Sequence, residues 1–206
     1  MKTWDQFFRD VLPDVPGCPE PVAEHAILRA AQEFFQRSRA WHLWLDDITT
    51  RGEISAYDLN LEPNSELVRL EGATLDGEII SLSRIEDMPS NWRTQSSGMR
   101  TCVFTTDSKT VQLLPIKAAD MKLSIRASLK PSNNAPGIAD DLFDLYVETI
   151  AMGAKSRLMA QPGKDYSNMA GADAWGGQFR DAVDTIKSRL WRGNAATRTR
   201  SRANLF

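Results

Sequence analysis

The stretch that decides the fold spans residues 19–44 and reads PEPVAEHAILRAAQEFFQRSRAWHLW. Its apolar side chains recur at steps of three and four positions, at Ile27, Ala30, Ala31, Phe34 and Phe35. This spacing places them on one face of a helix, because 3.6 residues make one turn. Prolines near the start and arginines near the end suit a helix, since the first turn needs no N–H there and the last turn favours positive charge. Trp41, Leu43 and Trp44 then break the helical period, and residues 46–54 are predicted to form a strand.

Length and composition are those of an ordinary globular protein. The chain has 206 residues, of which 42% are apolar and 25% charged, and this suits one domain or a domain with an insertion. The formal net charge is −2, so the chain as a whole is no general binder of polyanions. No acidic side chain follows Asp184, whereas the same segment contains Lys187, Arg189, Arg192, Arg198, Arg200 and Arg202. The end of the chain is therefore a basic segment on a mildly acidic body.

The cysteines and the apolar segments indicate a cytosolic setting. Cys18 and Cys102 lie far apart and belong to no motif, as expected of free thiols in a reducing compartment. Residues 1–15 lack the continuous apolar run of a signal peptide. No apolar run approaches the roughly 20 residues that a membrane span needs. We expect a protein that is cytosolic or assembled in the cytosol, with no membrane partner.

Helices are predicted at both ends of the chain. Residues 3–12 form a short helix, in which Thr3 and Gln6 have the spacing of a capping box. A second helical segment follows the break PSNNAPG at 131–137, starts at Ile138 and has an apolar row made of Phe143, Val147, Ile150, Ala154 and Leu158. Small residues at Gly153 and Ala154 would let another helix approach closely. A last helix is defined by Ala172, Trp175, Phe179, Val183, Ile186 and Leu190 and ends near Gly193.

Short alternating segments in the middle of the chain predict a small antiparallel sheet. Residues 67–70 and 78–82 flank the turn dipeptide Asp76-Gly77, and residues 100–105 and 110–114 flank Asp107-Ser108. Both patterns are typical of hairpins. Residues 122–129 alternate strictly between apolar and polar side chains, as a half-buried strand does.

The predicted fold class is therefore α+β, with a helical bundle built from the N- and C-terminal helices. We assign residues 1–42 and 132–192 to the bundle and residues 43–131 to an inserted antiparallel β domain. Residues 193–206 have no apolar periodicity and are predicted to be a flexible C-terminal arm.

The sequence contains no constellation typical of an enzyme or of a cofactor or metal site. His25 and His42 have no ligand spacing with the two cysteines, and no Walker loop, GxSxG or GxGxxG motif occurs. Gly176-Gly177 lies inside a helical pattern and indicates a close packing point or a kink. The acidic pairs at 46–47 and 140–141 have no neighbouring base, so turn and helix-start roles are expected. We predict no catalytic, cofactor-binding or metal-binding residue.

The basic arm allows three interpretations. Its arginines could contact nucleic acid phosphates, which would make binding fall steeply with salt. Alternatively, the arm could order on a partner protein, with arginines paired to carboxylates and Leu205 and Phe206 in apolar pockets. It could also be a solvated end. The apolar final residues favour a protein partner over nucleic acid, and Trp191, between Arg189 and Arg192, is a candidate interface residue.

The segment WDQFFRDVLPDVPGCPEPVAEHAILRAAQEFFQRSRAW resembles the opening of tailed-phage head–tail adaptor (connector) proteins. Residues 129–131 resemble the segment before the returning helices of that family, and LYVETIAMGAKSRLMAQPGKDYSN at 145–168 resembles those helices themselves. A more distant similarity links the chain to the tail tubular protein of short-tailed phages. The similar segments lie at both ends of the chain, and the sheet is the least similar part.

The resemblance implies a structural protein of the virion, located at the capsid vertex where head and tail meet. Such proteins assemble as a ring, typically of twelve copies, beneath the portal protein and offer a platform to the tail or nozzle protein. Double-stranded DNA passes through the ring without sequence recognition. The family's C-terminal arm docks to the portal, which implies portal contacts at Arg198, Arg200, Arg202, Leu205 and Phe206. The alternatives are another phage ring component, such as a tail terminator, and a DNA-binding protein that uses the arginine-rich arm.

Overall fold

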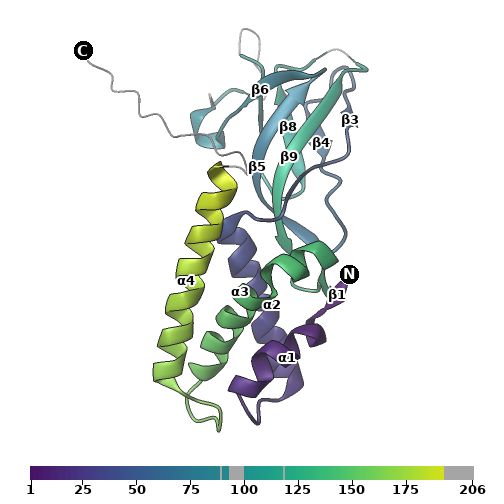
Figure 1. Ribbon diagram of the computed structural model, residues 1–206. Coiled ribbons are helices and arrows are strands. Elements are labelled where there is room, and N and C mark those ends of the chain that lie inside the picture. The colour runs from purple at the N-terminus through teal and green to yellow at the C-terminus, as the bar shows by residue number, and fades with distance from the viewer. Residues whose placement is uncertain (89, 93–99, 118, 193–206) are drawn as a thin grey trace, which may run out of the picture.

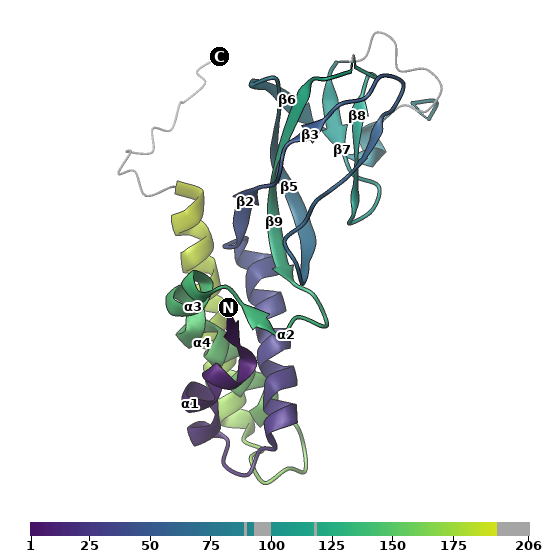
Figure 2. The same cartoon turned by 90° about the vertical axis from the view of Figure 1, so that its right-hand side faces the viewer.

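The computed structural model describes residues 1–88, 90–92, 100–117 and 119–192. The fold is α+β, as predicted: helices from both ends of the chain pack into a bundle, and the middle of the chain forms a sheet. The sheet extends from one end of the bundle, and the last turns of α4 reach its base (Figures 1 and 2). Among the described helices, none is long and apolar enough to cross a lipid bilayer.

The N-terminal helical segment consists of three short pieces. The helical elements of the bundle are η1 (Trp4–Phe7), α1 (Phe8–Val11), η2 (Leu12–Asp14), α2 (Glu20–Ser38), α3 (Asp140–Met159) and α4 (Met169–Arg192). The predicted capping box is wrong, because the Thr3 side chain makes no capping hydrogen bond to a backbone N–H of η1. The Gln6 side chain donates instead to the Asp5 carboxylate, with an N–O distance of 3.3 Å. A tight 3₁₀ turn thus replaces the α-helical start that a capping box requires.

Helix α2 follows the sequence pattern closely. Pro19 precedes it in an extended conformation, and Arg39 ends it in the left-handed region, with its N–H donating to the Phe35 carbonyl at 2.9 Å. The predicted apolar face is fully buried, with no exposed surface at Ile27, Ala30, Ala31, Phe34 and Phe35. The helix therefore provides one wall of the bundle core.

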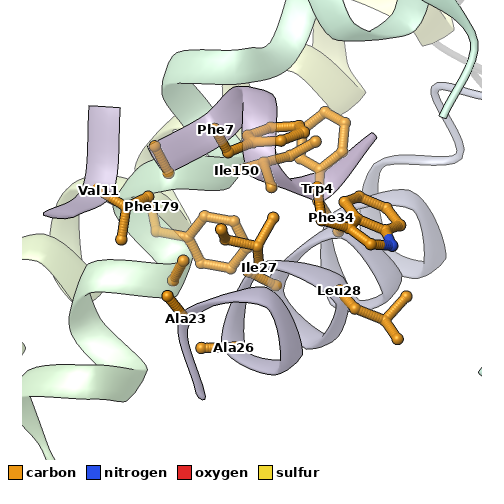
Figure 3. Close-up of a cluster of buried hydrophobic side chains, with 14 of the residues drawn as sticks. Trp4, Phe7, Val11, Ala23, Ala26, Ile27, Leu28, Phe34, Ile150 and Phe179 are labelled. Carbon is orange, nitrogen blue, oxygen red and sulfur yellow. The ribbon is translucent and has the colours of Figure 1, made fainter. Parts of the chain in front are cut away.

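Side chains from all the bundle helices meet in this core (Figure 3). Phe7 from η1, Phe34 from α2, Ile150 from α3 and Phe179 from α4 are all buried. The indole N–H of Trp4 donates to the Ala135 carbonyl at 2.6 Å, which attaches the N-terminal segment to the loop before α3. The helices from the two ends of the chain are neighbours, as the sequence predicts.

The small residues of α3 and α4 lie where helices approach closely. A Cβ atom at Gly153 would lie 3.0 Å from the Phe179 ring and 3.1 Å from the Ala30 Cβ. A Cβ atom at Gly176 would lie 2.8 Å from the Ser156 hydroxyl oxygen, whereas the same position at Gly177 is open. The close approach predicted for Gly153 is confirmed, and Gly176 is a packing point within a continuous α4.

The sheet has the strand order β2-β9-β5-β6-β7-β8-β4, with β3 also paired to β9. Its strands are β2 (His42–Trp44), β3 (Ile48–Thr49), β4 (Ala56–Asp58), β5 (Ser65–Leu75), β6 (Glu78–Leu82), β7 (Cys102–Phe104), β8 (Thr110–Leu114) and β9 (Lys122–Pro131). All pairings are antiparallel except β6 with β7, because the connection between these two strands, which contains η3 (Ile85–Asp87), returns the chain in the same direction. Both predicted hairpins are present, at β5–β6 and β7–β8.

The strand predicted at residues 46–54 is wrong in extent. Only Ile48 and Thr49 pair with β9. The chain then turns, and the Tyr57 hydroxyl fixes the turn by donating to the Ile54 carbonyl at 2.9 Å. The loose alternation of this segment therefore reflects a loop along β9 rather than one strand.

A small second sheet attaches the N-terminus to the start of α3. Strand β1 (Lys2–Thr3) pairs with β10 (Gly137–Ile138). A Cβ atom at Gly137 would lie 1.9 Å from the Lys2 carbonyl oxygen. Only glycine allows this approach, so residue 137 in the PSNNAPG break has a structural role.

The β7–β8 hairpin provides a test of stability against pH. The Asp107 carboxylate accepts the N–H groups of Lys109 and Thr110, at 2.7 and 2.6 Å, and these bonds lower the pKa of Asp107 below its ordinary value of 3.8. A depressed folded-state pKa means that the stabilisation is present above the unfolded pKa and is lost as the pH falls through the folded one. We expect Asp107→Asn to destabilise the protein at pH 6, and the difference from wild type to shrink below about pH 4.

Urea unfolding of both proteins over this pH range would measure that difference. Subtracting the variant's free energy of unfolding from that of wild type removes the contribution of the other carboxylates, which titrate equally in both proteins. A difference that stays constant down to about pH 3 would contradict this role of Asp107.

Candidate assembly surfaces

The residues predicted to contact the portal lie outside the described part of the chain. Arg198, Arg200, Arg202, Leu205 and Phe206 belong to the segment 193–206, so their role stays a prediction. Trp191, predicted as an interface residue, is described at the end of α4 and is 78% exposed.

The residues considered as candidate metal ligands or acid–base groups do not come together in one site. His25 is exposed on α2 and lines a different recess from His42, whose Nδ1 lies 3.2 Å from the Arg39 carbonyl oxygen. Asp47 is bonded to Lys122 and Ser124 of β9, and these contacts lower the pKa of its carboxyl. Within the described ranges, no three His, Cys, Asp or Glu side chains are placed to hold a metal ion.

Arg39 and Glu71 connect the bundle to the sheet. The left-handed backbone of Arg39 ends α2, and its Nη1 lies 3.3 Å from both carboxylate oxygens of Glu71 on β5. Ser128 on β9 is fully buried and donates its hydroxyl to the same carboxylate at 2.7 Å. Both charged side chains are only about one-fifth exposed, at 19% and 20%, so each charge is stabilised largely by the other instead of by water. Helix α2, β5 and β9 are thus joined at one point.

Apolar contacts reinforce this joint. Trp41 packs against both the bundle core and the core of the sheet. The Arg39 guanidinium lies 5.5 Å from the ring centroid of Trp191, which adds the last turn of α4 to the joint. The orientation of the sheet relative to the bundle is therefore set by packed side chains as well as by the chain connections.

An exposed surface of unusual composition lies beside this joint. We call it the junction surface and define it by Trp44, Arg126, Lys187 and Trp191. Trp44 and Arg126 are directly opposite in the β2–β9 pair, so their side chains lie on the same side of the sheet. Lys187 and Trp191 are four residues apart on α4, which places them on one helix face. Trp44 is 53% and Trp191 78% exposed.

A pocket of about 200 Å³ lies within the junction surface, and its lining includes Arg39, Glu71, Arg126, Ser128, Lys187 and Trp191. Glu71 is already neutralised by Arg39. Arg126 and Lys187 form no ion pair with any residue that the structure describes. The pocket therefore has excess positive charge next to two exposed tryptophans.

A second exposed surface follows α3. We call it the acidic face of α3 and define it by Asp141, Asp144, Leu145 and Glu148, all of which are exposed. Leu145 is 66% exposed. In the described part of the chain, none of its three carboxylates forms an ion pair, whereas the preceding Asp140 lies 2.7 Å from the α-amino group of Met1. This face is both acidic and partly apolar.

Arg189 on α4 belongs to neither surface, because its guanidinium interacts with Tyr146 of the same subunit. Burial raises the pKa of Tyr146 on α3, and the Arg189 guanidinium beside its hydroxyl opposes that shift. Arg189 is thus engaged within its own subunit, unlike Arg126 and Lys187. The basic residues of α4 are therefore not equivalent.

A third surface is apolar and lies on the part of the sheet far from the bundle (Figure 1). Ile79 on β6 is 90% exposed, and Leu82, Ile85 and Ile116 are exposed as well. A recess of about 470 Å³ beside Ile79 is lined in part by Arg100 and Lys117. We call Ile79 and the recess beside it the distal apolar surface.

Sequence reasoning did not find the junction surface. The alternation of residues 122–129 did place Arg126 on the polar side of its strand, and the spacing of α4 placed Trp191 near basic residues. Neither pattern shows that β9, β2 and α4 converge, because their pairing is set by contacts between residues distant in the sequence.

Comparison with known proteins gives one result. A family model described as SU10 adaptor protein matches residues 3–204, nearly the whole chain. No curated protein sequence matches the chain significantly. The more distant similarity to the tail tubular protein of short-tailed phages therefore stays a prediction.

Proposed function

The chain belongs to the SU10 adaptor protein family, and from that premise we propose that it is a head–tail adaptor which forms a ring beneath the portal of a tailed phage. The membership itself identifies a phage adaptor protein and a structural component of the virion. The proposal adds a ring of about twelve copies, portal docking, a platform for the tail or nozzle protein, and passage of double-stranded DNA.

The observation that carries the proposal is the extent of the family match. It covers residues 3–204, so it includes the bundle, the sheet and most of the arm. The described surfaces support an assembly role, because Trp44, Ile79 and Trp191 are large apolar side chains left 53%, 90% and 78% exposed in a single copy. Exposed apolar surface of this kind marks contacts with other proteins.

The proposed adaptor needs neither catalysis nor a cofactor. Its work is to bind on two sides, and the net charge of −2 suits a channel through which DNA slides rather than sticks. The basic arm of residues 193–206 is the proposed portal contact, with Arg198, Arg200 and Arg202 pairing with carboxylates and Leu205 and Phe206 entering apolar pockets.

Co-sedimentation with portal rings from the same source tests this proposal. We expect the full chain to bind the portal and a chain ending at Gly193 to lose binding. The triple change Arg198→Glu, Arg200→Glu and Arg202→Glu should weaken binding as strongly as the truncation, and the double change Leu205→Ser and Phe206→Ser should weaken it independently of salt. Arg180→Glu, at an exposed position of α4 outside the three surfaces, is the matched control and should bind like wild type.

The rival functions give different results in the same assay. Portal binding by the truncated chain would keep the adaptor but move the docking site to the described body. If neither chain binds portal while the full chain retains duplex DNA in a steeply salt-dependent manner, the arm is a nucleic acid contact and the adaptor proposal fails. Binding to completed tail tubes instead of portal would indicate a tail terminator.

A further inference from the structure

We propose that the junction surface of one copy binds the acidic face of α3 of the neighbouring copy. This inference rests on the proposed ring and identifies the two surfaces that close it. It assigns a partner to Arg126 and Lys187 on one side and to Asp144 and Glu148 on the other.

The junction surface has the composition of a binding site rather than of ordinary solvated surface. Tryptophan and arginine are the residues most enriched at the energetic centres of protein interfaces. Trp44 and Trp191 are 53% and 78% exposed, and the pocket next to Arg126 has about 200 Å³ of space. Because Glu71 is held by Arg39 and Ser128, it does not neutralise Arg126 or Lys187. The site is therefore suited to a carboxylate ligand with an apolar group beside it.

The acidic face of α3 supplies such a ligand. Asp141, Asp144 and Glu148 are three and four residues apart, so they follow one helix face over about 10 Å. Leu145 is 66% exposed among them. In the proposed contact, the carboxylates of this acidic face pair with Arg126 and Lys187, while Leu145 contacts the exposed indoles. An interface of this kind gains orientation from its charges and affinity from its apolar centre.

A second copy supplies the partner that neither surface has within its own subunit. Within one copy the last turn of α4 meets α3 through Arg189, beside the Tyr146 hydroxyl, and among the described residues Arg126 and Lys187 form no ion pair with the acidic face of α3. In Figure 1, α4 lies at the left of the bundle and the start of α3 toward the right. Contact between two different patches of identical chains is head-to-tail, the geometry that generates a ring when the rotation closes. The cationic pocket could in principle hold a phosphate, but Leu145 and the complementary carboxylates of this same chain favour a second copy.

Charge reversal tests the contact in the full chain. The first variant carries Arg126→Glu and Lys187→Glu, and the second carries Asp144→Lys and Glu148→Lys. Sedimentation velocity at low salt should show self-association of wild type, which weakens as salt is raised. Each variant alone should associate at least about tenfold more weakly, because like charges then face each other. Arg180→Glu, an exposed change elsewhere on α4, should leave association unchanged.

An equimolar mixture of the two variants is the decisive measurement. The first variant has two acidic surfaces and the second has two basic ones, so they complement each other at every contact of an alternating ring. We expect the mixture to regain wild-type association, while circular dichroism shows both variants to be folded. If the first variant is unfolded, Lys187→Glu alone, at an exposed position, replaces it.

Two results would overturn the inference: a mixture that stays monomeric, or a wild-type chain that never associates at low salt. If the first variant loses duplex DNA binding but keeps self-association, the pocket binds phosphate, and this result would also reject the inference. These outcomes are distinct from failure of the proposed function, because portal co-sedimentation with the C-terminal arm does not depend on either surface.

Discussion

Replacing Phe34 with alanine should lower the free energy of unfolding by about 4 kcal/mol. Phe34 lies on α2 with no exposed surface, and its ring centroid is 5.0 Å from that of Phe35 and 4.9 Å from that of Tyr146 on α3. The change removes apolar surface from the core and leaves a cavity that the surrounding helices fill only in part. A loss of this size is a large share of the stability of a typical domain, about 5–15 kcal/mol.

Urea denaturation at low protein concentration, followed by circular dichroism, measures this loss. Ile79→Ala on the distal apolar surface is the control, because Ile79 is 90% exposed and its truncation should cost no more than about 0.5 kcal/mol. A cost below about 1 kcal/mol for Phe34→Ala would mean that α2 and α3 do not pack as described.

The helical part of the fold could be predicted from the sequence because its apolar periodicity is long and unambiguous. The face of Ile27, Phe34 and Phe35 on α2 is the face that packs in the bundle. The row that begins at Phe143 likewise defined α3 within two residues of its start. Over about twenty residues, a 3.6-residue period leaves little room for another interpretation.

The parts that were predicted wrongly are short segments governed by contacts distant in the sequence. Residues 46–54 were predicted to be one strand, but a turn fixed by the Tyr57 hydroxyl leaves only Ile48 and Thr49 paired. The Thr3 capping box fails because η1 begins as a 3₁₀ helix and Gln6 bonds to Asp5. Local spacing alone cannot distinguish these cases.

The candidate surfaces, too, could be predicted only where local sequence patterns determine them. The basic residues of α4 are visible in the sequence, yet only the structure distinguishes Arg189, beside Tyr146, from Lys187, beside the pocket. Likewise, Ser128 was assigned to the polar side of its strand, but it is fully buried because Glu71 accepts its hydroxyl. Interaction surfaces depend on which elements converge, and a single sequence does not contain that information in local form.

Replacing Gly153 with leucine should also destabilise the protein strongly, by about 3 kcal/mol. This glycine lies where α3 meets both α2 and α4. A Cβ atom there would already be 3.1 Å from the Ala30 Cβ and 3.0 Å from the Phe179 ring, so the remaining side-chain atoms would have no space without separating the helices. Because α4 also supplies Lys187 and Trp191, such a displacement should reach the junction surface as well.

Gly177→Leu on α4 is the matched control for this substitution. A Cβ atom at Gly177 meets nothing within 4 Å, so leucine there should leave stability unchanged or raise it by up to about 1 kcal/mol, since glycine is the weaker helix former. Thermal unfolding of both variants and wild type measures the contrast. Equal stability of the two variants would contradict the close packing of α3 against α2 and α4. If only Gly153→Leu loses stability, and its folded fraction also associates more weakly, the packing of the bundle core holds α4 in the position that the neighbouring copy binds.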